Sequence, residues 1–270
     1  MVRVAFIGAG NMASSLIGGL LRAGTRAQDL IAADPFAEQR NKLSALGVGT
    51  TADNARAVDA ADAVVLAVKP QVMRDVVVGL EPHLPRDTLL ISIAAGVTTT
   101  SITAWSRPAQ PIVRCMPNTP ALYGAGVTAL FANGHVDEAQ RSLAADILSA
   151  AGEVIWVRDE SQLDAVTALS GSGPAYFFYL MEAMVAAGQR LGLDREVAMA
   201  LTLATAQGSA IMARDSGLEP TQLRRNVTSP GGTTERAVGV LDDARVRQNI
   251  EAAIEQAAQR SRELAEQFGK

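Results

Sequence analysis

Near its beginning the sequence reads Val2-Arg-Val-Ala-Phe-Ile-Gly8-Ala9-Gly10-Asn11-Met12-Ala13. The apolar run at Val2–Gly8 predicts a buried strand, and the residues from Ser14 to Leu21 predict a helix. Two glycines and an alanine between them match the Gly-x-Gly-x-x-Gly/Ala pattern that holds the pyrophosphate of a dinucleotide at a helix N-terminus. The stretch therefore predicts the first strand, turn and helix of a dinucleotide-binding domain. The turn residues expected to contact the cofactor are Ile7, Gly8, Ala9, Gly10, Asn11 and Met12.

From this first strand to about residue 159, short runs of Val, Ile, Leu and Ala alternate with helical patterns. Such nearly continuous apolar runs are typical of strands that are buried on both faces of a parallel sheet. The alternation predicts the α/β class, with an N-terminal Rossmann-type, doubly wound, mostly parallel sheet. The expected strands are Val2–Gly8, Leu30–Ala33, Ala63–Val68, Leu89–Ala94, Ile112–Met116, Gly126–Ala132 and Val154–Val157.

The rest of the chain, residues 160–270, has a different pattern, without a convincing strand and with long helical periodicities. Some of these helices are apolar on more than one face, which indicates burial against a partner. Pro174 lies inside the first of them and predicts a kink or break. We therefore expect two domains, a dinucleotide-binding domain at 1–159 and an all-helical substrate-binding and dimerisation domain at 160–270. The expected helices are Gln162–Leu191, Arg195–Ser216, Pro220–Asn226, Thr233–Leu241 and Arg245–Gln267.

The composition excludes several classes of protein. Hydrophobic residues make up 48% of the 270 residues and charged residues 19%, so the chain can bury a substantial core. The net charge of -4, without a basic block, argues against nucleic acid as a partner. Cys115 is the only cysteine and there are two histidines, so we expect a reducing, cytoplasmic setting and no metal site. No apolar run is long enough to span a membrane.

Further cofactor contacts are expected where the strands end, because open α/β sheets bind ligands at the carboxyl ends of their strands. Asp34 follows the second strand, where an acidic residue accepts hydrogen bonds from ribose hydroxyls and repels a 2′-phosphate. Asp34 therefore favours NAD on physical grounds; the alternative is that it only starts a turn before Pro35. The other expected contacts are Ala67, Val68, Lys69, Pro70, Ala94 and Asn118.

A polar, glycine-rich turn between two helical patterns stands out in the second domain. It reads Val227-Thr-Ser-Pro-Gly231-Gly232-Thr233-Thr234-Glu235. Backbone N–H groups and the positive end of a helix dipole suit such a turn for binding a carboxylate or phosphate. Serine and threonine are also common helix caps, so a capped helix start is the simpler alternative.

Together these motifs resemble pyrroline-5-carboxylate reductase, from Val4 to about Arg262. The similarity includes Phe6–Met12, Ala67–Pro70, Ile93–Val97, Met116–Ala121, Leu169–Tyr176 and, most specifically, Val227–Thr234. The resemblance implies reduction of 1-pyrroline-5-carboxylate to L-proline with NADP(H), the last step of proline biosynthesis, with NAD(H) kept open because of Asp34. It also implies a homodimer, often assembled further into a decamer.

The resemblance implies roles for individual residues as well. Thr234 is the catalytic hydroxyl near the ring nitrogen, and the Gly231, Gly232 and Thr233 backbone holds the substrate carboxylate. Glu160 occupies a position that meets the amine, where it can stabilise the positive ring. Asn54 and Asn226 are at cofactor-contacting positions.

Two other functions compete with this interpretation. A β-hydroxyacid dehydrogenase has a similar two-domain plan, but it needs a lysine in the first helix of the second domain. No lysine occurs between Lys69 and Lys270, which argues against that chemistry. A non-catalytic dinucleotide sensor would not need the Gly-Gly-Thr-Thr turn.

Overall fold

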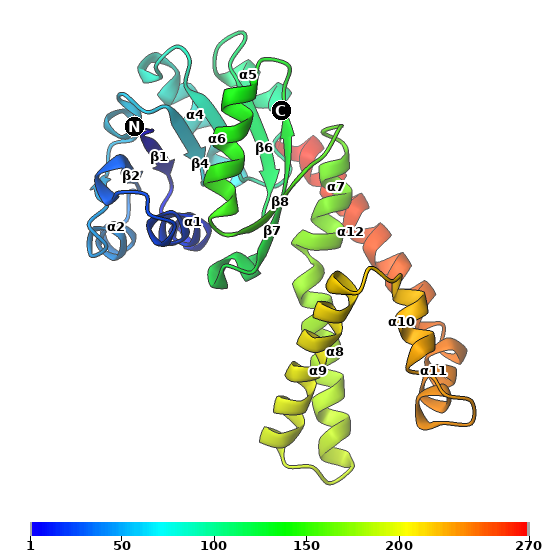
Figure 1. Ribbon diagram of the computed structural model, residues 1–270. Helices are drawn as coiled ribbons and strands as arrows, with labels where there is room; N and C mark the ends of the chain where they lie inside the picture. Colours follow the sequence, from blue (N-terminus) through cyan, green and yellow to red (C-terminus); the bar gives the residue numbers. More distant parts are fainter. Residues whose placement is uncertain (1, 269–270) are drawn as a thin grey trace. The chain divides into compact units, whose positions relative to one another are not determined.

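A computed structural model describes residues 2–268 of the chain (Figure 1). The chain divides into two compact units. The first contains residues up to Ser172 together with those from Gln256 onward, and the second spans Gly173–Glu255.

The first unit is built on one eight-stranded sheet with the order β3-β2-β1-β4-β5-β6-β7-β8. Neighbouring strands are parallel except β6 and β7, which are antiparallel. The first six strands thus follow the 3-2-1-4-5-6 order of the doubly wound fold, which is the fold class that the sequence predicts. The strands are β1 (Val4–Ile7), β2 (Leu30–Ala33), β3 (Gly49–Thr51), β4 (Ala63–Leu66), β5 (Leu89–Ser92), β6 (Ile112–Met116), β7 (Gly126–Ala132) and β8 (Gly152–Trp156).

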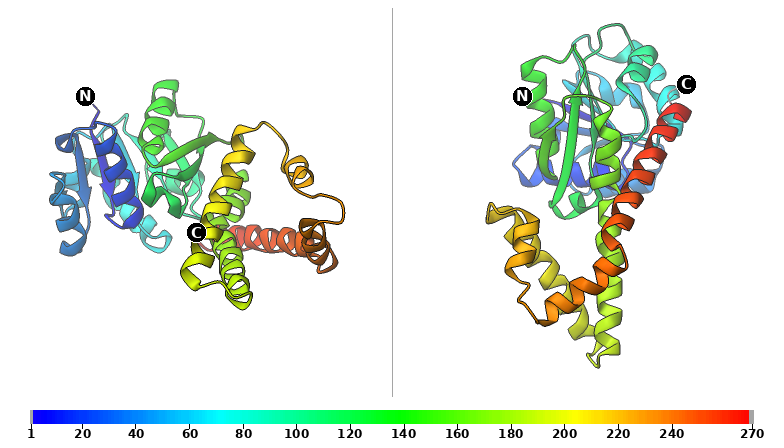
Figure 2. Two further views of the ribbon diagram at one scale, coloured as in Figure 1. Left: turned by 60° about the horizontal axis from the view of Figure 1, so that its bottom comes forward. Right: turned by 90° about the vertical axis from the view of Figure 1, so that its right-hand side faces the viewer.

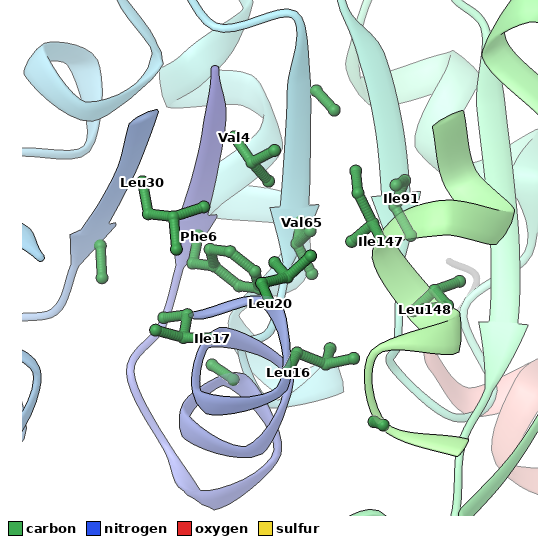
Figure 3. Packing of buried hydrophobic residues seen from close by; sticks show 14 of the residues in the cluster. Val4, Phe6, Leu16, Ile17, Leu20, Leu30, Val65, Ile91, Ile147 and Leu148 are labelled. Carbon is green, nitrogen blue, oxygen red and sulfur yellow. The ribbon is translucent and has the colours of Figure 1, made fainter. Parts of the chain in front are cut away.

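Helices cover both faces of this sheet (Figure 2). Val4 and Phe6 face a core formed with α1 and α6, whereas Ala5 and Ile7 face a second core formed with α3, α4 and α5. Figure 3 shows Phe6 beside the side chains of α1. Each large apolar side chain buried in this way contributes about 1.5–3 kcal/mol. The helices are α1 (Asn11–Arg22), α2 (Ala37–Ser44), α3 (Asn54–Val58), α4 (Pro70–Leu80), α5 (Thr99–Trp105), α6 (Glu138–Ser149) and α7 (Gln162–Val166).

The antiparallel step from β6 to β7 follows from the length of the connection. Residues 117–125 join the two strands and contain only the 3₁₀ turn η3 (Thr119–Tyr123). A parallel crossover needs a dozen or more residues, so this segment can only return the chain in the opposite direction.

The second unit is helical, as expected from its sequence. It contains α8 (Gly173–Arg190), α9 (Arg195–Asp215), α10 (Pro220–Asn226), α11 (Thr233–Asp243) and the beginning of α12 (Val246–Phe268). Helices α8 and α9 pack as a hairpin whose turn has Gly192 at φ +95°. Large apolar side chains nevertheless stay exposed in this unit, among them Phe177, Phe178, Tyr179 and Leu201. Exposed apolar surface of this kind is typical of an interface.

One strand was not expected, and one expected break in a helix is present. The short edge strand β3 was not expected, because its three residues, Gly-Thr-Thr, carry no apolar run. The helix expected over 162–191 is interrupted before Gly173, next to Pro174, which confirms the predicted break. The interruption takes the form of the π-helical turn η4 (Thr167–Gly171).

The compact units also divide the chain at a different place from the expected boundary at 159/160. Helix α7 packs against β6 and β7 and therefore lies with the sheet. The last turns of α12 do the same, because Ser261 Oγ donates a 2.7 Å hydrogen bond to Asp164 Oδ1. A Cβ on Gly96 would lie 3.3 Å from the backbone of Leu264 and Ala265, which shows how closely α12 approaches the turn after β5.

Candidate active site

The expected cofactor residues of the first unit gather along one edge of the sheet. Gly8, Asp34, Ala67, Ala94 and Asn118 each follow the end of a different strand, namely β1, β2, β4, β5 and β6. These five strands run in the same direction, so their carboxyl ends form a single edge. This is the edge at which open α/β sheets bind ligands.

The glycine-rich turn has the geometry that a pyrophosphate needs. Gly8 has φ +97°, and a Cβ there would lie 2.5 Å from the carbonyl oxygen of Ala67, so only glycine fits. A Cβ on Gly10 would meet nothing within 4 Å, which leaves room for a ligand to approach the backbone. Gly10 is also the N-cap of α1, and no side chain caps this helix. The first-turn N–H groups of Asn11 and Met12 are therefore suited to hold an anion.

Asp34 is buried at the end of β2, and both of its carboxylate oxygens are bound by the protein. Oδ2 accepts a 2.8 Å hydrogen bond from the N–H of Ala9, and Oδ1 accepts one of 2.9 Å from the N–H of Phe36. The carboxylate thus ties the glycine-rich turn to the end of β2. The turn before Pro35 that the sequence left as an alternative is also present, because the Phe36 bond closes it.

The remaining cofactor candidates of this unit lie on turns next to the same edge. Lys69 is exposed as the N-cap of α4, and Pro70 is at the first helical position. Asn54 is the first residue of α3, whose N-terminus is capped by Asp53. Asn54 lines an open hollow of about 410 Å³ between α3 and α4.

A larger hollow, of about 550 Å³, lies at the opposite edge of the sheet. It is lined by Arg3, Arg26 and Asp29, near the amino ends of β1 and β2. Dinucleotides bind at the carboxyl ends of the strands in this fold, so the size of this hollow is not evidence for cofactor binding.

Asn118 joins two of the motifs that the sequence singled out. Its amide oxygen accepts a 3.0 Å hydrogen bond from Val127 N–H, and its amide nitrogen donates one of 3.2 Å to the carbonyl of Ser170. A Cβ on Gly171 would lie 2.6 Å from the Met116 side chain. The Met116–Pro120 turn therefore packs directly against the π-helical turn η4.

Glu160 lies in the first unit, where its carboxylate has three partners. Oε1 accepts from Thr99 N–H at 2.7 Å and from Arg114 Nη1 at 3.0 Å, and Oε2 accepts from Thr99 Oγ1 at 2.7 Å. The Arg114 side chain is 5% exposed and that of Glu160 is 20% exposed. The carboxylate therefore links the start of α5, strand β6 and the entry to α7.

The turn expected to bind substrate lies in the second unit. Gly231 has φ +72°, and its N–H donates a 2.8 Å hydrogen bond to Glu235 Oε2. Gly232 is the N-cap of α11 without a capping side chain, so the serine or threonine cap of the simpler alternative does not form. Thr233 and Thr234 occupy the first turn of the helix. A hollow of about 360 Å³ lies beside Gly231 and Gly232.

Comparison with known proteins identifies the family of this chain. A family model described as pyrroline-5-carboxylate reductase dimerisation matches residues 160–264, and one described as NADP oxidoreductase, coenzyme F420-dependent, matches residues 3–96. The pyrroline-5-carboxylate reductase of Pseudomonas aeruginosa is 53% identical over 99% of this chain and 98% of its own length. The chain belongs to the pyrroline-5-carboxylate reductase family.

Solved structures of the pyrroline-5-carboxylate reductase family agree with the fold. The reductase of Coxiella burnetii superposes with a TM-score of 0.93 at 43% identity, covering 98% of each chain. The enzyme of Plasmodium falciparum, solved with NADP bound, gives a TM-score of 0.89 at 30% identity and the same coverage. Membership in this family confirms the resemblance and the dinucleotide-binding oxidoreductase class, and its dimerisation domain implies an oligomer.

The partners of Glu160 were not foreseen from the sequence. Arg114 and Thr99, the partners of Glu160, were not singled out, although an arginine inside the apolar run Ile112–Met116 is a visible signal. Asn226 ends α10, where its Oδ1 accepts from Gln222 Nε2 at 2.8 Å. This residue and the Gly231–Thr234 turn belong to the second unit, whereas the other predicted site residues belong to the first.

Metal-binding and membrane-spanning features can be assessed for residues 2–268. Over that range no group of three or more His, Cys, Asp and Glu side chains is placed to hold a metal ion. Over the same range no helix has the length and apolar character to cross a membrane. Cys115 is buried within β6, and burial raises the pKa of its thiol far above the usual range.

Proposed function

We propose that this chain reduces the C=N bond of 1-pyrroline-5-carboxylate with NAD(P)H and so forms L-proline, the last step of proline biosynthesis. The observation that carries the proposal is the full-length match to pyrroline-5-carboxylate reductases, at 53% identity over 99% of the chain. The glycine-rich turn at the end of β1 supports it, because its geometry suits a dinucleotide.

The dinucleotide, when bound, supplies a hydride to the carbon of the imine. The first unit positions this hydride donor. The uncapped N-terminus of α1 would bind the pyrophosphate, and the open space at Gly10 would let it approach the backbone. We assign the remaining contacts to Ile7, Gly8, Ala9, Asn11, Met12, Asn54, Ala67, Val68, Lys69, Pro70, Ala94, Asn118 and Asn226.

The second substrate is assigned to the turn before α11. The backbone of Gly231, Gly232 and Thr233 binds the carboxylate of the imino acid at the positive end of the helix dipole. Thr234 Oγ1 orients the ring nitrogen by hydrogen bonding. Because a threonine hydroxyl titrates far above neutral pH, it does not donate a whole proton, and the nitrogen takes its proton from solvent.

Glu160 is proposed to stabilise the positive ring through its charge. The Thr99 and Arg114 bonds occupy part of its hydrogen-bonding capacity and fix its orientation. Each carboxylate oxygen can accept two bonds, so Oε2, which has one partner, retains capacity for an amine.

NADP(H) is the proposed cofactor, with NAD(H) as the alternative that Asp34 raises. The bonds from Ala9 and Phe36 each use one acceptor position on the Asp34 carboxylate and do not exclude a further bond from a ribose hydroxyl. The two cofactors therefore have to be compared directly. We propose further that two copies pair through the exposed apolar surface of the second unit, and that such dimers assemble into a decamer.

The reaction is tested by following NADPH and NADH absorbance on addition of pyrroline-5-carboxylate, which should start oxidation. Thr234→Ala should lose roughly 1–3 kcal/mol of transition-state stabilisation, the scale of one buried hydrogen bond. Thr234→Ser keeps a hydroxyl and should recover most of kcat/KM. An unchanged kcat/KM for Thr234→Ala would exclude the proposed role. Equal binding of a substrate analogue without a carboxylate would exclude the Gly231–Thr233 site.

A further inference from the structure

Arg40 has an unusual position at the start of α2. Its Nη1 donates two hydrogen bonds to backbone carbonyls, one of 2.7 Å to Asp34 and one of 2.9 Å to Pro35. The side chain is half-buried, so these bonds fix the guanidinium against the end of β2. The role of Arg40 rests on the dinucleotide binding proposed for the carboxyl edge of the sheet.

The rest of the guanidinium remains available to a ligand. An arginine has five N–H donors, of which the two carbonyls use the pair on Nη1. Within residues 2–268, Nε and Nη2 of Arg40 have no hydrogen-bond partner. The side chain thus presents a fixed fork of donors, which matches the geometry of a phosphate.

The charge of Arg40 is also unbalanced. Over the described part of the chain, no carboxylate lies within 4.0 Å of its guanidinium, whereas Lys42 on the same helix is paired with Glu38 at 2.9 Å. The carboxylate of Asp34 is directed instead to the N–H groups of Ala9 and Phe36. A cation held in this way, without an acidic partner, is suited to receive an anion from outside the chain.

The position of Arg40 at the end of β2 indicates which anion it binds. The carbonyls that hold Arg40 belong to Asp34 and Pro35, at the carboxyl end of β2, and Asp34 also contacts the glycine-rich turn. In dinucleotide-binding sheets the adenosine ribose lies at this strand end, and an arginine nearby accommodates a 2′-phosphate. We propose that Arg40 binds the 2′-phosphate of NADPH and makes this chain select NADPH although Asp34 is present.

Binding of two adenosine fragments tests the proposal without turnover. 2′,5′-ADP carries the 2′-phosphate and 5′-AMP lacks it, so calorimetric titration of both isolates the contribution of that group. The unchanged chain should bind 2′,5′-ADP at least about tenfold more tightly. Arg40→Gln should weaken 2′,5′-ADP by about 10- to 100-fold, as expected for loss of a charge-assisted bidentate contact, and change 5′-AMP less than twofold.

Two further variants sharpen the result. Lys42→Gln removes a positive charge from the same helix and should leave the preference for 2′,5′-ADP unchanged. Arg40→Lys keeps the charge without the fork and should retain only part of that preference.

The outcomes separate this proposal from the reductase function. If Arg40→Gln weakens both fragments equally, or neither, the 2′-phosphate role is wrong. If the unchanged chain binds both fragments with the expected preference but does not reduce pyrroline-5-carboxylate, the reductase function fails while the role of Arg40 stands. If it binds neither fragment, or both equally, but oxidises the cofactor on addition of pyrroline-5-carboxylate, the role of Arg40 fails while the reductase function stands.

Discussion

Replacement of Glu160 by alanine should destabilise the first unit because it leaves Arg114 without its anion. The Arg114 side chain is 5% exposed, and its guanidinium lies 3.0 Å from the Glu160 carboxylate. Removing one partner of a buried ion pair typically costs about 3–5 kcal/mol, against ~0–1 kcal/mol for an exposed pair. Since the Glu160 side chain is 20% exposed, we expect the low end of the buried range, about 3 kcal/mol.

Urea unfolding followed by tryptophan fluorescence measures this loss. Because the dimerisation domain implies an oligomer, all variants must be compared at one protein concentration, and a second concentration shows the contribution of assembly. Glu38→Gln is the matched control, because Glu38 and Lys42 form an exposed i,i+4 pair in the same unit whose loss should cost about 0.3–0.5 kcal/mol.

A double replacement tests the physical cause. Arg114→Met combined with Glu160→Leu removes both charges and leaves no buried ion, so it should cost much less than the two single changes added together. Additive costs would show that the loss comes from packing. A cost for Glu160→Ala no larger than that of the control would refute the argument from burial.

A further variant, Glu160→Gln, separates the structural role of Glu160 from its proposed contact with substrate. Glu160→Gln keeps the shape of the side chain and one of its acceptors. If the carboxylate also stabilises the positive ring, kcat/KM of the folded enzyme should fall even where unfolding shows the protein intact. An unchanged kcat/KM would leave Glu160 as a structural tie between α5, β6 and α7.

Two other substitutions and one labelling experiment have outcomes that follow directly from the structure. Gly8→Ala should abolish binding of 2′,5′-ADP and cost about 2 kcal/mol or more of stability, because the new Cβ meets the Ala67 carbonyl at φ +97°; unaltered fragment binding would contradict this. Asn118→Ala should lower the free energy of unfolding by roughly 2–4 kcal/mol, because the hydrogen bonds to Val127 and Ser170 are lost. Cys115 should not react with a thiol reagent in the native protein and should react after unfolding in urea, because burial keeps its thiol protonated. Mass spectrometry measures the labelling, and a labelled native protein would refute this.

The fold was predictable where the local pattern determines the element. Strands β2 and β6 have the predicted bounds because mainly apolar runs end there at polar or proline-containing turns. Edge strand β3 has no such run and forms because the backbone of Ala33 pairs with that of Thr51. The division into units also depends on distant contacts, such as that of Ser261 with Asp164, which no local pattern encodes.

The sequence predicts residues for the candidate site but not the partners that these residues have within the fold. The position of Asp34 after a strand predicts a cofactor contact, and the family resemblance predicts a substrate contact for Glu160; both stay predictions. Their carboxylates are bound by Ala9, 25 residues away from Asp34, and by Thr99, 61 residues away from Glu160. Such pairings arise when the strand ends converge, so they require the folded sheet.

The packing of the Met116 turn against η4 affects how loss of activity in a variant should be interpreted. The turn that begins at Met116 and the π-helical turn η4 form one joint, because Asn118 bonds to Ser170 and Gly171 admits the Met116 side chain. A replacement of Met116, Ser170 or Gly171 can move the carboxyl edge of the sheet without removing a proposed ligand contact. Kinetics alone cannot distinguish the two causes. A true contact with the adenosine end should change fragment binding at constant stability, whereas damage to the joint should change both together.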